Sequence, residues 1–111
     1  MALDLRVLDK LANHDATKIR KFALLFLQSM DEILGQLDTA IASQDLALLG
    51  AMGHRAKSTA LNVGAADFSQ QCLLLEQATH SQDSATALAI ALELRPRYAS
   101  LHAAITQHIA S

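Results

Sequence analysis

Apolar side chains recur every three or four residues through most of this chain, the spacing that aligns side chains along one face of an α-helix. The longest such stretch begins after Asp15 and continues to about Ser43. Its apolar stripe consists of Ile19, Phe22, Ala23, Phe26, Met30, Ile33, Leu34, Leu37 and Ile41. Aspartate and glutamate residues lie on the opposite face, which favours a helix in a bundle core over one on a membrane surface.

The segments on either side of this helix have the same periodicity. Residues 4–11 are predicted to form a short helix with Leu5, Leu8 and Leu11 on one side, and residues 13–15 interrupt it. A third helix is predicted from about residue 46. Its face of apolar or small residues consists of Leu46, Leu49, Met52, Ala56, Ala60 and Val63.

Several residues mark where these helices begin and end. Asp15 and Asp45 are predicted to cap the second and third helices by accepting hydrogen bonds from free backbone N–H groups. Gly64 tolerates a left-handed backbone and is predicted to end the third helix. Asp83 or Ser84 is predicted to cap the last helix, which runs to about residue 108.

The fourth helix is predicted to start at a capping-box-like pair, Asp67 and Gln70. Its inner face consists of Phe68, Cys72, Leu75 and Thr79. A polar turn at 80–83 separates it from the last helix. Pro96 lies inside that last helix and lacks a backbone donor, so we expect a kink or a break there.

These elements predict an all-α protein. Because the connections are short, neighbouring long helices must run antiparallel. The expected fold is an antiparallel up-down-up-down four-helix bundle with a short N-terminal helix across one end, forming a single domain over residues 1–111.

Composition narrows the class of protein. The 111 residues are 51% hydrophobic but 4% aromatic, and abundant alanine and leucine favour helix over sheet. A formal net charge of −2 offers no basic surface for nucleic acid. One cysteine excludes an internal disulfide and is compatible with a reducing cytoplasm.

Targeting and membrane signals are not apparent. Residues 1–4 lack the basic and apolar regions of a signal peptide. The longest apolar run, 22–27, is far short of the roughly 20 residues that span a bilayer. We therefore expect a cytoplasmic, monomeric protein that binds neither membranes nor nucleic acid.

His54 is the reactive side chain that the helical pattern leaves exposed. On a helical wheel it lies about 160° from Ala56, on the side facing water. A useful fraction of imidazole groups is neutral and nucleophilic near neutral pH. A surface histidine alone would still indicate no function, so any function of His54 must be inferred from the residues around it.

Those residues form an extended motif: His54-x-x-Lys57-Ser58-Thr59, then Val63-Gly64-Ala65, then Phe68-x-x-x-Cys72-x-x-Leu75-Glu76. The motif resembles the signature of histidine-containing phosphotransfer (HPt) domains and covers about a fifth of the chain. A histidine and lysine alone would be a weak signal, but the later residues in register make the pattern specific. Two positions depart from the family: Ser58 stands where it often has Gly, and Ala56 where it often has Leu or Ile.

In that family an exposed histidine on the second long helix of a four-helix bundle carries a phosphoryl group between receiver-domain aspartates. The resemblance implies that His54 accepts phosphate from the receiver of a hybrid histidine kinase and passes it to a response regulator. No kinase ATP motif or Gly-rich phosphate loop is present, so we expect a carrier that is not an enzyme. No cofactor is expected on this chain, and Mg²⁺ is expected on the partner receiver.

Two side chains are expected to support this histidine. Lys57, one turn along and predicted to be exposed, can donate to phosphoryl oxygens and offset part of their charge. By resemblance, Glu76 is a carboxylate that reaches toward the active histidine. The alternatives are an ordinary solvated lysine and an ordinary carboxylate at the edge of the core.

The predicted docking surface surrounds His54. Ala47, Gly50 and Leu61 fall on its helical face, and an exposed leucine among small residues suits the apolar centre of a transient interface. Ser58 is included with them. The resemblance adds Gly64, whose small size leaves room near the histidine.

The remaining candidates have less specific interpretations. Cys72 is interpreted as a small packed apolar residue. Four other histidines lack metal-binding spacing and are interpreted as surface residues: His14, His80, His102 and His108. The alternative function is a helical interaction module that is not phosphorylated, and a metal-binding bundle is disfavoured for want of ligands.

Overall fold

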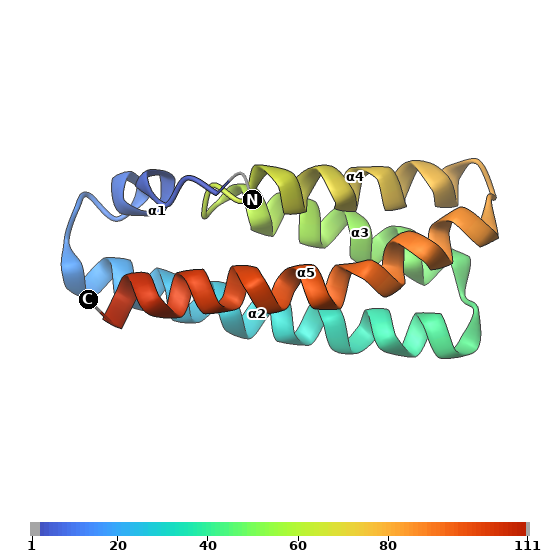
Figure 1. Ribbon diagram of the computed structural model, residues 1–111, viewed down its shortest axis with the longest axis horizontal. Coiled ribbons are helices and arrows are strands. Elements are labelled where there is room, and N and C mark those ends of the chain that lie inside the picture. The colour runs from blue at the N-terminus through green and yellow to red at the C-terminus, as the bar shows by residue number, and fades with distance from the viewer. Residues whose placement is uncertain (1–2, 111) are drawn as a thin grey trace.

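The computed structural model describes residues 3–110 and contains five helices. They are α1 (Arg6–Leu11), α2 (Ala16–Ser43), α3 (Leu46–Leu61), α4 (Ala66–His80) and α5 (Ser84–Ala110). Figure 1 shows the four long helices running alternately up and down one elongated bundle of 43 × 20 × 18 Å. Outside the helices of the described range, strand-like pairing is a single antiparallel bridge between Leu3 and Ala65. The predicted four-helix bundle is confirmed.

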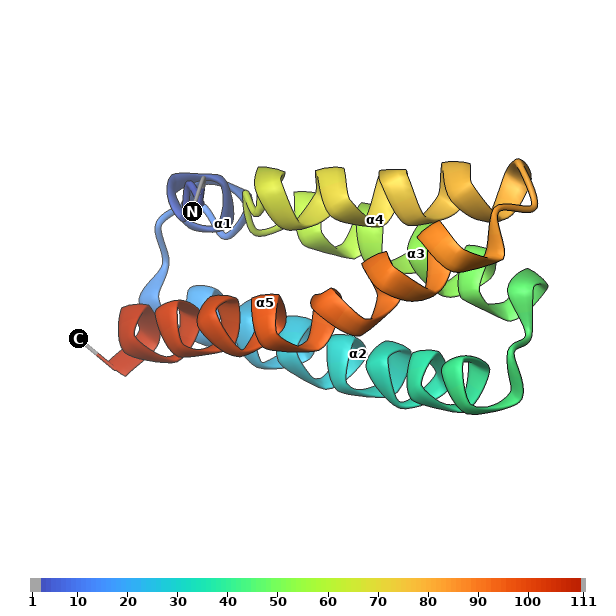
Figure 2. The ribbon, with the colours of Figure 1, turned by 45° about the vertical axis from the view of Figure 1, so that its right-hand side comes forward.

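The four long helices have unequal lengths, and α1 lies where the two shorter ones do not reach. The α2 and α5 helices have 28 and 27 residues, whereas α3 and α4 have 16 and 15. In Figure 1, α1 lies beyond the start of α4, and Figure 2 shows it turned across the bundle. Leu8 is buried there. Leu11, predicted on the same side, is 56% exposed because the helix ends there and the chain turns away through Asn13 and His14, which have positive φ.

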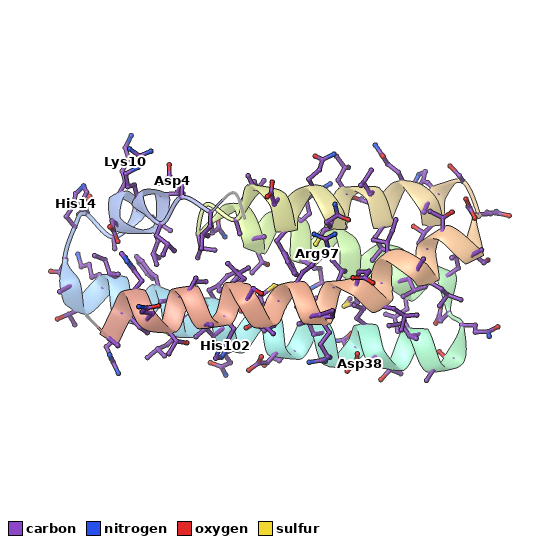
Figure 3. All side chains as sticks on the ribbon, in the orientation of Figure 1. Asp4, Lys10, His14, Asp38, Arg97 and His102 are labelled. Carbon is purple, nitrogen blue, oxygen red and sulfur yellow. The ribbon has the colours of Figure 1, made fainter. Side chains whose placement is uncertain are left out.

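The core follows the predicted stripes. Six of the nine stripe residues of α2 are buried, while Ile19, Phe22 and Ile41 at its ends are half-buried. Near the middle of the bundle the Tyr98 hydroxyl donates to the Leu27 carbonyl at 3.4 Å, and its ring lies 6.2 Å from that of Phe68. The polar side chains of Asp4, Lys10 and His14 point away from the core at the α1 end, as Figure 3 shows.

Three of the predicted helix caps are confirmed. Asp15 and Asp45 each accept a backbone N–H bond of 3.0 Å, and Asp83 accepts one of 3.2 Å at the start of α5. The predicted cap of α4 is wrong. This helix begins at Ala66 without a side-chain cap, and Asp67 lies inside its first turn. The chain enters α4 directly because Ala65 is already held by its bridge to Leu3 and by a backbone bond to Ala60.

Gly64 has the predicted left-handed backbone, with φ of 73°. The α3 helix ends earlier, however, at Leu61 with Asn62 as its C-cap. The Gly64 carbonyl accepts the Asp4 N–H at 2.9 Å, and a Cβ at Gly64 would lie 2.0 Å from the Asp4 carbonyl oxygen. Glycine therefore allows the N-terminal segment to pack against the turn between α3 and α4.

Pro96 kinks α5 without breaking it. The helix is continuous from Ser84 to Ala110, and Pro96 is exposed on its outer side. In Figures 1 and 2 the two halves of α5 run in different directions. A missing backbone donor on the solvent side lets the helix bend without leaving a buried carbonyl unpaired.

Candidate functional site

His54 lies on the outer face of α3, with its side chain 62% exposed. Ala56, two residues later, is buried in the bundle core. The Asp45 cap sets where α3 starts, and the buried face of the helix then leaves His54 on the opposite side. The exposed position predicted for His54 is confirmed.

Glu76, on α4, joins the two candidate residues of α3. One carboxylate oxygen, Oε2, lies 2.8 Å from His54 Nδ1, and the other, Oε1, lies 2.7 Å from Lys57 Nζ. The three residues implied by the motif therefore form one hydrogen-bonded group across the α3–α4 interface. Both oxygens of a single carboxylate are used.

This arrangement determines which nitrogen of His54 can react. An ionised carboxylate only accepts hydrogen bonds, so the bond to Glu76 requires the proton on Nδ1. In the neutral imidazole, Nε2 then carries the free electron pair. Within residues 3–110 no hydrogen bond occupies Nε2. The site thus presents Nε2 as the nucleophilic nitrogen of an exposed imidazole, while Glu76 holds the ring at Nδ1.

Glu76 is held in its ionised form. The hydrogen bond from the Lys57 ammonium lowers the pKa of Glu76 most, and the bond to His54 lowers it further, while partial burial acts in the opposite direction. The carboxylate therefore stays negatively charged near neutral pH. It can offset positive charge that develops on the imidazole ring.

Lys57 is less exposed than predicted. Its side chain is 25% exposed because it lies at the side of α3 that faces α4, where it reaches Glu76. The Lys57 carbonyl also accepts a 3.1 Å bond from the Ser69 hydroxyl, and Ser69 is the buried polar residue of the described core. The interpretation as a freely solvated lysine is wrong, and a role toward phosphate stays a prediction.

A cleft of about 700 Å³ opens beside His54. It lies between the first half of α3 and the end of α4 and is lined by Leu46, Ala47, Gly50, Ala51, His54, Arg55, Glu76, Thr79, His80 and Gln82. On the other side of Glu76, a hollow of about 580 Å³ is lined by Lys57, Leu73, Gln77, His80 and Ser81. The histidine therefore stands at the edge of a concave surface that a partner can enter.

The structure separates the predicted docking residues into two groups. Ala47, Ser58 and Leu61 are exposed near His54, and Leu61 is 54% exposed. Gly50 is half-buried and faces Thr79 of α4, and Gly64 faces the N-terminal segment. Packing accounts for both glycines, and their docking roles stay predictions.

The other histidines are distributed over the surface, with one exception. His14, His80 and His102 are exposed, as predicted. His108 was predicted to be a surface residue, but it is half-buried and its Nε2 lies 2.8 Å from Asp9 Oδ1. The pair joins the end of α5 to α1, a contact between residues too far apart in sequence to be read from a helical pattern.

Cys72 is fully buried, and burial raises the pKa of its thiol to about 12, which confirms it as a packing residue. No three histidine, cysteine, aspartate or glutamate side chains gather as a metal site between residues 3 and 110. No helix in this range is both long and apolar enough to cross a membrane.

Three contacts near the site were not anticipated from the sequence. Ser69 and Thr79 hydrogen-bond to the backbone on either side of the site, and Gly53 contacts α4 beside Glu76. The pair Gly50-x-x-Gly53 directly before His54 was the available signal, because glycine is unfavourable inside a helix unless close packing requires it.

At this site an exposed imidazole is fixed at Nδ1 by a carboxylate and flanked by a lysine, an arrangement that suits a carrier accepting a group on histidine. Sequence comparison agrees with this class: the Hpt domain family matches residues 21–109, and the chain belongs to that family. Hpt domains are phosphotransfer carriers of two-component systems.

Two solved structures share the fold. Histidine-containing phosphotransfer protein B (HptB) from Pseudomonas aeruginosa PAO1 is 23% identical, with a TM-score of 0.89 over 98% of this chain and 95% of that one. The HPT domain of the Hpt sensor hybrid histidine kinase from Shewanella is 20% identical, with a TM-score of 0.81 over 97% and 93%. No curated protein sequence matches the chain.

The lowered pKa of Glu76 predicts a pH-dependent contribution to stability. A carboxylate with a depressed folded-state pKa stabilises the fold above its unfolded pKa of about 4.3 and loses that effect as pH falls through the folded value. Glu76→Gln should therefore lower the free energy of unfolding at neutral pH by up to about 1 kcal/mol. The difference from wild type should shrink as the pH falls below about 4.3 and through the lowered folded-state pKa of Glu76.

Urea unfolding of both proteins at a series of pH values measures this difference. Glu32→Gln is the control, because Glu32 is exposed on α2 and has no ion-pair partner in the described range. A Glu76→Gln effect that is the same at every pH would show that its charge does not stabilise the fold.

Proposed function

We propose that this protein is a phosphorelay carrier in which His54 holds the phosphoryl group. His54 accepts it from the receiver-domain aspartate of a hybrid histidine kinase and passes it to the receiver of a response regulator. The observation that supports this most is the 2.8 Å contact between Glu76 and Nδ1, which leaves Nε2 as the nucleophile. Family membership supports the general class.

The proposed transfer is a balanced displacement at phosphorus. The Nε2 electron pair attacks the aspartyl phosphate, the bond between phosphorus and the aspartate oxygen breaks, and the aspartate leaves as a carboxylate. The ring then carries the phosphoryl group on Nε2 and a proton on Nδ1, so it is positively charged. Glu76 accepts from Nδ1–H and stabilises that charge.

Lys57 supplies positive charge near the histidine. Its ammonium lies one helical turn from His54 and is held by Glu76 at 2.7 Å. The phosphoryl group brings a charge of roughly −1.5 to −2. A lysine side chain is flexible enough to share its donors between Glu76 and the phosphoryl oxygens.

In this proposal the receiver domain provides most of the groups that catalyse the transfer. This chain supplies a nucleophile and its supporting charges, while the receiver supplies the aspartate that carries the phosphoryl group and the Mg²⁺ that neutralises it. The protein acts as a monomeric carrier in the cytoplasm, without kinase activity, cofactor, or binding to nucleic acid or membranes.

The receiver docks on the exposed face of α3. Ala47 and Ala51 line the cleft beside His54, and Leu61 provides an exposed apolar contact further along the helix. Ser58 lies between the histidine and the leucine on this face. Small side chains next to His54 let the receiver backbone approach Nε2 closely.

The function is tested by the label that a phosphorylated receiver leaves on the protein. A panel of receiver domains from the source organism is phosphorylated and mixed with the protein, and the fastest donor is kept. The product should carry one phosphate that is lost in acid and persists in base, as expected for a P–N bond. His54→Gln should abolish the label and change the free energy of unfolding by less than about 1 kcal/mol.

His102→Gln is the matched control, because His102 is also exposed but lies on α5. It should keep the full label. A label that survives in His54→Gln at another histidine contradicts the assignment, and no label on wild type from any receiver contradicts the function.

The docking surface is tested with Leu61→Glu. A charge in the apolar centre of the interface should weaken binding to the donor receiver about tenfold, because truncating a central apolar contact costs about 1–2 kcal/mol. Isothermal titration of the receiver measures the affinity. Leu92→Glu, at a leucine that is 61% exposed on α5, should leave the affinity unchanged. Equal effects of both variants would place the receiver elsewhere.

A further inference from the structure

Two of the four glycines lie within one turn of each other on α3, at Gly50 and Gly53, and both face α4. Figures 1 and 2 show α3 and α4 side by side. A Cβ added at Gly53 would lie 3.2 Å from the Cys72 carbonyl oxygen and 3.3 Å from the Leu75 side chain. At Gly50 it would lie 2.5 Å from the Thr79 hydroxyl. The two helices are in contact at positions where α3 has no side chain.

The contacted residues surround Glu76 on its own helix. Leu75 precedes it, Cys72 lies one turn before, and Thr79 one turn after, where its hydroxyl donates to the Glu76 carbonyl at 2.7 Å. Both glycines lie just before His54 on α3, Gly53 directly before it and Gly50 one turn before. The contacts at the two glycines therefore lie next to the hydrogen-bonded group of His54, Lys57 and Glu76.

The geometry of Glu76 depends on these contacts between the helices. Its two oxygens contact two residues of α3 at 2.8 and 2.7 Å, near the short end of the normal hydrogen-bond range. Hydrogen bonds between nitrogen and oxygen in proteins have donor–acceptor distances of about 2.7–3.2 Å. A separation of a few tenths of an ångström between the helices would lengthen both bonds toward the upper end of that range.

We propose that Gly50 and Gly53 are positioning residues that hold α4 close enough to α3 for Glu76 to fix the tautomer of His54. They touch neither His54 Nε2 nor a receiver in this role. Their effect is transmitted through the position of the Glu76 backbone. The importance of that tautomer for transfer rests on the proposed function, whereas the tautomer itself can be measured without any phosphate.

Gly53→Ala is the direct test. The Cys72 carbonyl belongs to the α4 backbone and cannot rotate away from the added methyl group, so α4 must move. Gly35→Ala is the matched control, because Gly35 also lies inside a long helix but has no heavy atom within 4 Å of its Cβ position. Replacing glycine by alanine favours both helices equally, so only packing distinguishes the two variants.

Histidine ¹⁵N chemical shifts in the unphosphorylated proteins report the tautomer. In wild type and Gly35→Ala, His54 should show a protonated Nδ1 and an unprotonated Nε2 once the imidazole is neutral. In Gly53→Ala the two shifts should move toward each other, because the weakened bond to Glu76 allows both tautomers. Shifts identical to wild type in a folded Gly53→Ala protein would overturn the proposal.

Transfer kinetics give a second readout. Gly53→Ala should lower the transfer rate at saturating receiver roughly 3- to 10-fold, since small misplacements of supporting groups slow chemistry. The receiver concentration at half-maximal rate should stay unchanged, because Gly53 is buried and cannot contact the receiver. An increase in that concentration with an unchanged maximal rate would assign the glycine to docking instead and overturn the proposal.

A second pair of variants covers the case in which Gly53→Ala does not fold. Gly50→Ala should shift the His54 resonances in the same direction, and adding Thr79→Ala should restore them, because it removes the hydroxyl and methyl that the new Cβ meets. Thr79→Ala alone shows how far the His54 resonances shift when only the Thr79 bond to the Glu76 carbonyl is lost. Absence of restoration in the double variant would overturn the proposal.

If no receiver labels wild type, the proposed function fails while the chemical shifts still decide the positioning role.

Discussion

The site depends on one carboxylate that bonds to two side chains of a neighbouring helix. Glu76 can hold His54 and Lys57 together only if α3 and α4 are packed closely and in the correct register. Glycines on α3 permit the distance, and a buried Ser69 hydroxyl bonded to the Lys57 carbonyl ties the helices together one turn further along. The exposed chemistry of the histidine is therefore determined by packing beneath it.

The rest of the bundle keeps this helix pair in place and leaves its outer face free. The long α2 and α5 helices extend past α3 and α4, and α1 covers the remaining core with Leu8. Gly64 lets the N-terminal segment close over the turn between α3 and α4. Because the core is complete without any contribution from His54, the imidazole is available for chemistry at little cost in stability.

Helical periodicity was sufficient to predict the bundle, most helix ends and the exposure of His54, because each of these depends on residues close together in the sequence. Glu76 could be suggested by resemblance, but its contacts depend on the distance between two helices. The partial burial of Lys57 and the packing role of Gly50 depend on the same distance between α3 and α4. The exposure of Lys57 was therefore misjudged, and the packing role of Gly50 was missed. The contact of His108 with Asp9 joins the two ends of the chain. The prediction of a side-chain cap for α4 was wrong because the N-terminal segment already holds Ala65 at the start of the helix.

The central claim is that Glu76 keeps the proton on Nδ1 and so directs the phosphoryl group to Nε2. Nuclear magnetic resonance of the phosphorylated protein, labelled with ¹⁵N at histidine, tests this most directly. We expect phosphorus to be coupled to Nε2 of His54 while Nδ1 remains protonated. Coupling of phosphorus to Nδ1 would contradict the account, because that nitrogen could not then donate to Glu76.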